Sequence, residues 1–354
     1  MSRRTCGVFD VKYEHTASMC ILRTPFHKIM MGAFLILLFS VPPLYFTENL
    51  LSILNTTCIT IIVVHGLNIL TGYCGQVNLG QAAFMMAGGY TSAILSTKAG
   101  LSFWACLPLS AIVSGLVGFA FGLPSLRIKG FYIAMSTLAA QYVLPWVIIH
   151  VPGLTGGIFG CRANSPVLAG ITFNTEQKWF FLILTFTIVM SFFARNFVRT
   201  KVGRAFIAIR DNDVAAEIMG INIFRYKVLA FGISSVFAGV GGSLMVHYLG
   251  VAQYEHFTLL NSIWYLGMLI VGGMGSPTGV ILGVVFLKGL TEFTLAATPA
   301  LANAFPMIAD TVAAAVGPIT FGTVIILFLI FEPRGLAHSW EILKSSMRIW
   351  PFPY

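Results

Sequence analysis

Lys288 and Glu292 are the two charged residues that lie deep inside an apolar segment of this 354-residue chain. They are four residues apart, so on a helix their side chains can pair with each other. A charged side chain within an apolar span is a candidate for function. Two interpretations stay open: a self-satisfied pair that faces a partner subunit or the pore, and a direct contact with a transported substrate.

Two glycine-rich stretches interrupt the apolar sequence: TGYCGQVNLGQ, from Thr71 to Gln81, and VGGMGSPTGV, from Val271 to Val280. Glycine permits a break in a helix, and amide side chains supply polar groups at the first break. The residues that we expect beside a translocation path are Gly72, Gly75, Gln76, Asn78, Gln81, Gly272, Gly273 and Gly275.

These breaks have more than one interpretation. Backbone at membrane depth must be hydrogen-bonded internally or line water. The first break is therefore either an ordinary cytoplasmic turn or a broken helix beside a substrate path, as in many transporters. Each break follows an apolar helix and precedes one rich in small residues, an order compatible with an internal repeat.

The segment IRDNDVAAEIMGI, from Ile209 to Ile221, is polar for this chain, because four of its thirteen residues are charged and the whole chain has 9%. Asp211, Asn212 and Asp213 are suited to the N-terminus of a helix, and Gly220 is suited to its end. Val214, Ile218 and Ile221 recur at helical spacing and predict an apolar face. A helix this short is marginal alone, so that face must pack on its own protein or the lipid surface, or dock on a soluble partner.

Basic residues are concentrated just before this segment. They are expected to hold the loop at the anionic inner leaflet of a membrane. The set is Arg195, Arg199, Lys201, Arg204 and Arg210.

Sequence motifs for covalent chemistry are missing. The chain has no G-x-x-x-x-G-K-[ST] phosphate loop and no H-E-x-x-H motif, and no G-x-S-x-G nucleophile elbow. Its six cysteines show no metal-ligand spacing. We therefore expect neither an enzyme nor a metal site nor a cofactor.

Composition predicts a membrane protein. Hydrophobic residues make up 57% of the chain and the mean hydropathy is +0.86, and a helix of about 20 apolar residues crosses a bilayer. We expect an all-α bundle of about eight to ten transmembrane helices. The candidate spans are 29–46, 50–70, 81–97, 102–122, 130–150, 179–195, 228–248, 261–273, 278–297 and 312–331.

Charge predicts the orientation. Most of the 21 Lys and Arg residues face the cytoplasm if both termini are inside. The expected parts are a cytoplasmic tail at 1–27, one transmembrane domain at 28–336 with a cytoplasmic loop at 196–226, and a cytoplasmic tail at 337–354. The net charge of +9 is dispersed over loop ends, so we expect lipid contact and no nucleic-acid surface.

Four blocks of this sequence, in order, resemble permeases of branched-chain amino acid importers of the ATP-binding-cassette type, most closely the second of their two permease subunits. The blocks are GLNILTGYCGQVNLGQAAFMMAGGYTSAIL (66–95), GLPSLRIKGFYIAMSTLAAQYV (122–143), AIRDNDVAAEIMGINIFRYKVLAFGISSVFAGVGGSL (208–244) and VGGMGSPTGVILG (271–283), with FEPRGL (331–336) after them.

The resemblance implies partners and a role for the polar segment. The partners are a second homologous permease forming a heterodimer, two ATPase subunits, and a periplasmic binding protein that would meet the loop at Thr155–Gly160. The setting is a bacterial inner membrane. The loop would carry a coupling helix seated in the ATPase, matched loosely by Ala215, Ala216, Glu217 and Gly220. The expected coupling residues are Asp213, Ala215, Ala216, Glu217, Ile218 and Gly220.

Other functions remain possible on the sequence. Related permeases handle urea or short amides, and the binding protein rather than the permease selects the ligand. An ATP-independent secondary transporter or channel is a different class, as is a membrane subunit of an energy-converting enzyme. Both need more intramembrane ionisable groups than Lys288 and Glu292 supply.

Overall fold

The computed structural model describes residues 37–43, 45–123, 132–168, 171–304 and 309–349. The chain divides into two compact units, residues 1–52 and residues 53–354. In the first unit, residues 37–43 are helical and α3 begins at Glu48. Half of the expected span at 29–46 lies outside the described residues.

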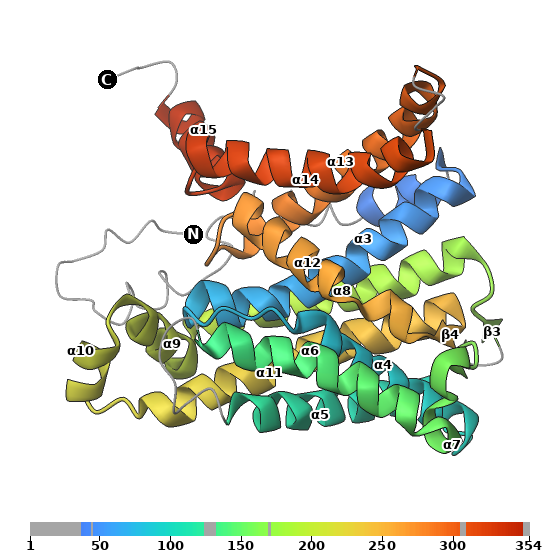
Figure 1. Ribbon diagram of the computed structural model, residues 1–354. Helices are drawn as coiled ribbons and strands as arrows, with labels where there is room; N and C mark the ends of the chain where they lie inside the picture. The colour runs from blue at the N-terminus through green and yellow to red at the C-terminus, as the bar shows by residue number, and fades with distance from the viewer. Residues whose placement is uncertain (1–36, 44, 124–131, 169–170, 305–308, 350–354) are drawn as a thin grey trace, which may run out of the picture. The chain divides into compact units, whose positions relative to one another are not determined.

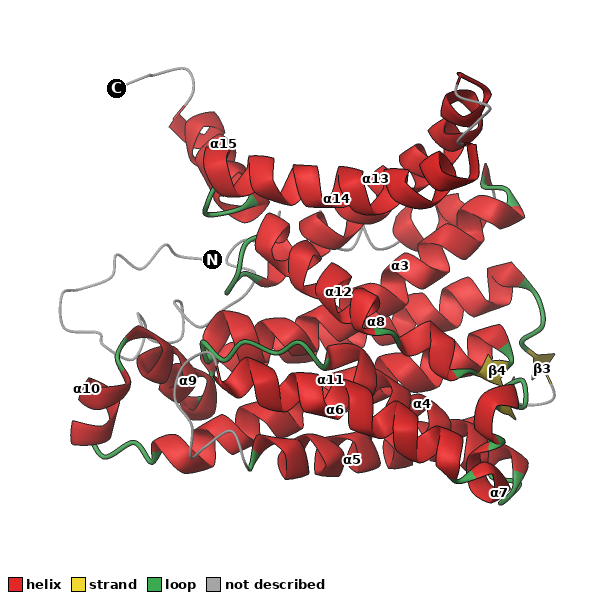
Figure 2. Ribbon diagram, viewed as in Figure 1, coloured by secondary structure: helices red, strands yellow, loops and turns green. Residues whose placement is uncertain are grey.

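The structure is helical almost throughout, as the composition predicts (Figure 2). The α-helices are α3 (Glu48–Leu67), α4 (Gln81–Thr97), α5 (Phe103–Gly122), α6 (Tyr132–His150), α7 (Pro152–Thr155), α8 (Glu176–Arg199), α9 (Lys201–Asp211), α10 (Asp213–Ile218), α11 (Ile223–Leu249), α12 (Leu259–Gly272), α13 (Pro277–Ala304), α14 (Ala309–Phe331) and α15 (Leu336–Ile349). Three other helical turns are a π-helix, η1 (Asn68–Tyr73), and two 3-10 turns, η3 (Gly157–Phe159) and η4 (Tyr254–Phe257).

Four short strands form two antiparallel pairs. β1 (Cys161–Arg162) pairs with β4 (Val251–Ala252), and β2 (Val167–Leu168) pairs with β3 (Ile171–Thr172). All four lie in the loops that follow α7 and α11. They tie the end of α11 to the loop between α7 and α8.

Six helices among the described residues are long and apolar enough to cross a membrane, or up to seven if the bent pair α14 and α15 is one span. The expected spans at 81–97 and 261–273 form α4 and α12, which have 17 and 14 residues. Helix α4 begins directly after the first glycine-rich break, and α12 ends at the second. The architecture is a polytopic bundle of membrane helices.

The centre of the bundle is α11, which packs on α4 and α5 (Figure 1). Glycines make this approach close: a Cβ at Gly242 would overlap the carbonyl oxygen of Met85, and a Cβ at Gly88 would overlap Gly239. Small residues let helices approach in this way. These glycines therefore serve helix packing.

A second apolar cluster joins α3 with α12, α13 and α14. Its buried members include Leu67, Leu269 and Val284. The rings of Trp264 and Phe321 lie 3.8 Å apart, centre to centre, across α12 and α14. Helix α15, in a segment expected to be a tail, contacts α12 and α13.

The 27-residue helix α11 separates two ends of the bundle. Helices α9 and α10 lie near its first residues, and α7 lies with strand β4 near its last residues (Figure 1). A force applied at α10 therefore enters the bundle at the end opposite to α7.

Candidate coupling and gating site

The first glycine-rich break is a broken helix. The helix α3 continues through the π-helix η1 to Tyr73, residues 74–80 are not helical, and α4 begins at Gln81. Gln81 Nε2 donates a hydrogen bond to the carbonyl oxygen of Val63, at 3.1 Å. Val63 precedes Tyr73 by about 15 Å of helix at 1.5 Å per residue. The chain therefore doubles back along α3 before α4 starts.

Side chains satisfy the backbone of this returning segment. The amide of Leu79 donates to Thr137 Oγ1 at 3.0 Å, and the amide of Gly80 donates to Asn78 Oδ1 at 2.8 Å. Asn78 Nδ2 donates in turn to Gln81 Oε1 at 2.8 Å. Asn78 and Gln81 are fully buried. Their hydrogen-bonding groups hold the break together.

The N-terminus of α4 is capped from α6 and α12. The amide of Ala82 donates to Ser262 Oγ at 2.9 Å, and the amide of Ala83 donates to Gln141 Oε1 at 3.0 Å. Ser262 Oγ also donates to Gln141 Oε1, at 3.1 Å. These side chains accept from amides in the first turn of α4, where regular helical acceptors are missing. The sequence did not indicate the roles of Thr137, Gln141 and Ser262, because an isolated polar residue in an apolar span gives no sign of what it caps.

The second break is a tight turn at residues 273–276, and it touches the first. The amide of Gly275 donates to Asn68 Oδ1 at 2.8 Å. A Cβ at Gly72 would overlap Asn68 Oδ1 and lie 2.6 Å from the amide nitrogen of Gly275. The glycines that the sequence places in two separate breaks therefore meet at one site.

Arg210 also reaches this site. Its Nη1 donates to the carbonyl oxygen of Gly72 at 2.9 Å, and its Nε and Nη2 donate to Asp211 Oδ1 at 3.0 and 2.9 Å. The expectation that Arg210 serves mainly to hold the loop at the lipid surface is wrong for this residue. Its guanidinium group lies between the π-helical carbonyl of Gly72 and the Asp211 carboxylate.

The polar segment forms helix α10 with the predicted ends. Asn212 Oδ1 accepts a hydrogen bond from the amide of Ala215 at 3.0 Å, which caps the first turn. After Ile218 the chain passes through Met219 to Gly220, which has φ +83°. Glycine adopts this left-handed conformation without steric cost. The predicted cap and stop are confirmed.

The apolar side chains of α10 point outward. Val214, Ile218 and Met219 are 57%, 80% and 82% exposed, whereas Ala216 is buried. Ile221 packs partly against the main core. The expected single face of Val214, Ile218 and Ile221 is therefore wrong, because the turn at Gly220 sends Ile221 inward and leaves the others outside. Asp213 is half-buried, and Ala215, Glu217 and Gly220 are exposed.

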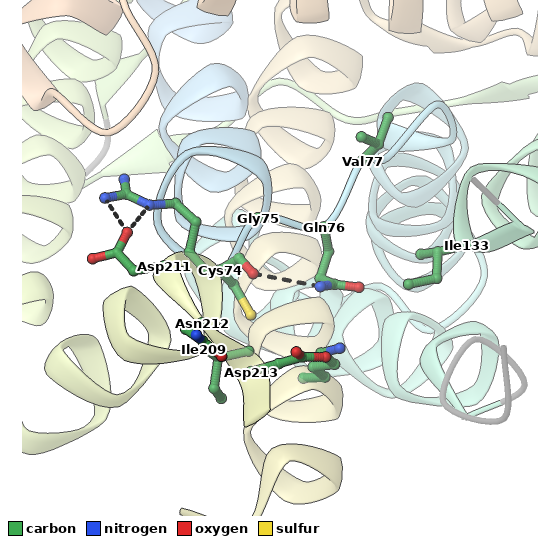
Figure 3. A pocket seen from close by; sticks show the side chains of 11 residues that line it. Cys74, Gly75, Gln76, Val77, Ile133, Ile209, Asp211, Asn212 and Asp213 are labelled. Atoms are coloured by element: carbon green, nitrogen blue, oxygen red, sulfur yellow. Dashed lines mark hydrogen bonds and ion pairs between the residues drawn. The ribbon is translucent and has the colours of Figure 1, made fainter. Parts of the chain in front are cut away.

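A pocket of about 600 Å³ lies between the first break and the start of α10 (Figure 3). It is lined by residues 74–77 and 209–213, and by Ile133 and Lys227. Gln76 is buried, and its Oε1 has no hydrogen-bond partner among the described residues. Among the expected path residues, Gly75 and Gln76 thus line an open space, and Asn78 and Gln81 do not. Whether this space is part of a translocation path stays a prediction.

Lys288 and Glu292 lie on α13 and are both half-buried. They do not form an ion pair, although both are among the described residues. Whether these two charges face a partner subunit or the pore, or contact a substrate, stays a prediction. Helical spacing permits the contact, but partial exposure leaves each side chain other directions to take.

Comparison with known proteins identifies relatives over most of the chain. Residues 49–330 match the family model of the permease component of branched-chain amino acid transport systems. The chain is 30% identical to the high-affinity branched-chain amino acid permease proteins LivM of Salmonella typhimurium and Escherichia coli, over 83% of this chain and 71% of each relative. It is 22% identical to the ribose import permease RbsC of Escherichia coli, over 71% of this chain and 79% of that protein. No solved structure matches.

Proposed function

We propose a function from one premise: this chain belongs to the family of permease components of branched-chain amino acid transport systems. It is a multi-pass inner-membrane protein and a transport subunit of an ATP-binding-cassette system, not an enzyme. ATP is hydrolysed by a separate subunit, and the family associates with ATPase and binding-protein partners.

The finer assignment is that the chain forms part of the import path for leucine, isoleucine or valine, paired with a second permease in a heterodimer. The two LivM relatives support this substrate, because they have higher identity than the ribose permease. A secondary transporter is set aside, because the family works with separate ATPases.

The coupling role is supported by the exposed apolar side chains of α10 and of Met219, which follows it. Val214, Ile218 and Met219 are exposed beside the charged residues Asp213 and Glu217. A fixed, capped turn that presents apolar side chains is suited to a groove of a soluble partner. We assign this surface to the ATPase subunit, with α10 on the cytoplasmic side.

The opposite end of the bundle offers a second surface. Leu154, Ile158 and Phe159, on α7 and η3, are 51%, 63% and 91% exposed. Thr155 and Gly157 beneath them are buried. We assign the exposed trio to contact with the periplasmic binding protein.

Substitution of Ile218 tests this assignment in the complete transporter, reconstituted in vesicles with its ATPases and binding protein. Ile218→Asp places a charge in the docking groove and should weaken ATPase docking about thirtyfold, the cost of about 2 kcal/mol for a buried anchor residue. ATP-driven uptake of labelled leucine should fall with it. Ile218→Met keeps the apolar contact and should transport normally.

The same vesicles test the substrate. Unlabelled isoleucine and valine should compete with leucine, and ribose and short amides should not. Normal uptake by the Ile218→Asp transporter would reject the docking role of α10. Competition by a short amide alone would reassign the substrate and leave the coupling role intact.

A further inference from the structure

Arg210 connects the loop that carries α10 with both helix breaks. It is the next-to-last residue of α9 and comes two residues before Asn212, which caps α10. Its side chain reaches across to Gly72, 138 residues earlier in the chain.

Glycines of both breaks lie close to the Arg210 side chain. A Cβ at Gly75 would lie 3.0 Å from Arg210 Cγ, and a Cβ at Gly275 would lie 3.1 Å from Arg210 Nη1. The guanidinium group donates to the carbonyl oxygen of Gly72 at the same place. Arg210 thus touches the π-helix, the returning segment and the second turn together.

The orientation of the Arg210 guanidinium group, rather than its charge, makes its contact with Gly72 specific. The ion pair of Arg210 with Asp211 is partly exposed, with side chains 38% and 61% accessible, and exposed pairs contribute little stability. Arginine, however, holds five donors in a rigid plane. With Nε and Nη2 fixed on Asp211, Nη1 is aimed at Gly72 (Figure 3 shows the pair with Asp211).

The carbonyl oxygen that accepts from Arg210 belongs to a segment whose backbone is suited to a change of conformation. Gly72 lies in the π-helix η1, and π-helical turns are rare and frequent at functional sites. Asn68, in the same turn, accepts from the amide of Gly275. A movement of η1 is therefore shared with the second break through Asn68.

We propose that Arg210 is a positioning residue that ties α10 to both helix breaks, so that a displacement of α10 moves Gly72 and, through Asn68, Gly275. Asp211 fixes the guanidinium plane. This inference rests on the proposed function, because it takes the displacement of α10 to come from the ATPase.

The test compares Arg210→Lys with Arg204→Lys in the reconstituted transporter. Lysine keeps the charge and loses the planar fork. Arg204 is exposed on the same helix, and no hydrogen bond or ion pair of its side chain is shown among the residues that the structure describes. Arg210→Lys should raise the ATP hydrolysed per leucine imported by about tenfold, the size of effect that loss of one charge-assisted hydrogen bond permits. Arg204→Lys should leave that ratio unchanged.

Two further measurements separate coupling from folding. Asp211→Asn should raise the same ratio by a smaller factor, because the fork stays but loses its anchor. In the full-length chain alone, hydrogen exchange at residues 70–76 should be faster with Arg210→Lys than with Arg204→Lys.

Each remaining outcome contradicts either the positioning role of Arg210 or the proposed function on which it rests. An unchanged ATP-to-leucine ratio in Arg210→Lys would overturn the proposal, and so would unchanged exchange at residues 70–76. Loss of folded Arg210→Lys protein, with normal coupling in Asp211→Asn, would also overturn it, since the side chain would then serve folding alone. Failure of the proposed function is recognised separately, because wild-type and Arg204→Lys transporters would then show no ATP-driven uptake.

Discussion

Single glycines set how closely the helices of this bundle approach one another. Gly242 on α11 lies against the backbone of Met85 on α4, and both are buried in the centre of the bundle. A side chain at this position has no flexible neighbour to displace. Gly289, on α13, is exposed, and a Cβ there would meet no atom within 4 Å in the described part of the chain.

These two glycines give opposite predictions for the same substitution. Gly242→Ala should lower the free energy of unfolding by about 1–3 kcal/mol, because two backbones must separate to admit the methyl group. Gly289→Ala should be neutral or raise that free energy by up to about 1 kcal/mol through helix propensity. Unfolding of the purified subunit in mixed detergent micelles measures both. Equal effects would show that α4 and α11 are not packed backbone to backbone.

Capping side chains hold the broken element between α3 and α4. The start of α4 and the residues before it are largely buried, so the amides of Leu79, Ala82 and Ala83 donate to side chains rather than to water. The acceptors are Thr137, Ser262 and Gln141. Gln141 Nε2 also donates to the carbonyl oxygen of Phe257 at 2.7 Å. Gln141 therefore joins the break to α6 and to the turn before α12.

Removal of this cap should loosen the break. Gln141→Leu keeps the side-chain volume similar and leaves buried polar groups unpaired, so the free energy of unfolding should fall by about 1–3 kcal/mol. Amide hydrogen exchange at residues 79–83 should accelerate. The control is Thr185→Val on α8, because Thr185 is exposed and its hydroxyl bonds within its own helix. Exchange as slow in Gln141→Leu as in the wild-type protein would mean that other contacts stabilise the break.

The whole molecule presents different surfaces at the two ends of α11. The end with α9 and α10 contains most of the basic residues of the central loop, and the other end contains the exposed apolar residues Ile158 and Phe159. Basic loops stay on the cytoplasmic side of a membrane. The charge distribution therefore predicts which end faces the binding protein.

Thiol labelling tests this orientation. In a variant without native cysteines, Phe159→Cys should react with a membrane-impermeant maleimide in spheroplasts, because Phe159 is 91% exposed at the outer end. Met219→Cys, at a residue 82% exposed on the α10 loop, should react in inverted vesicles and not in spheroplasts. The reverse pattern would place α10 outside and end its role in ATPase coupling.

Part of the site could be predicted from local sequence, and part could not. The cap at Asn212 and the turn at Gly220 follow from residue types within one helical turn. The direction of Ile218 does not, because apolar side chains can face a core or a partner equally well in sequence. The inward turn of Arg210 also depends on Gly72, which is distant in sequence. Helical spacing permits an ion pair of Lys288 with Glu292, and none is shown between these two described residues.

The sequence by itself determined the class of protein, the membrane setting, the two breaks and the ends of α10. These depend on composition and on neighbouring residues, which hydropathy and backbone preference govern directly. The tertiary structure alone decided that both breaks meet at Gly72 and Gly275 and that distant side chains cap them. Those contacts join residues between 58 and 207 positions apart. Helix packing brings such residues together, and no local pattern records that packing.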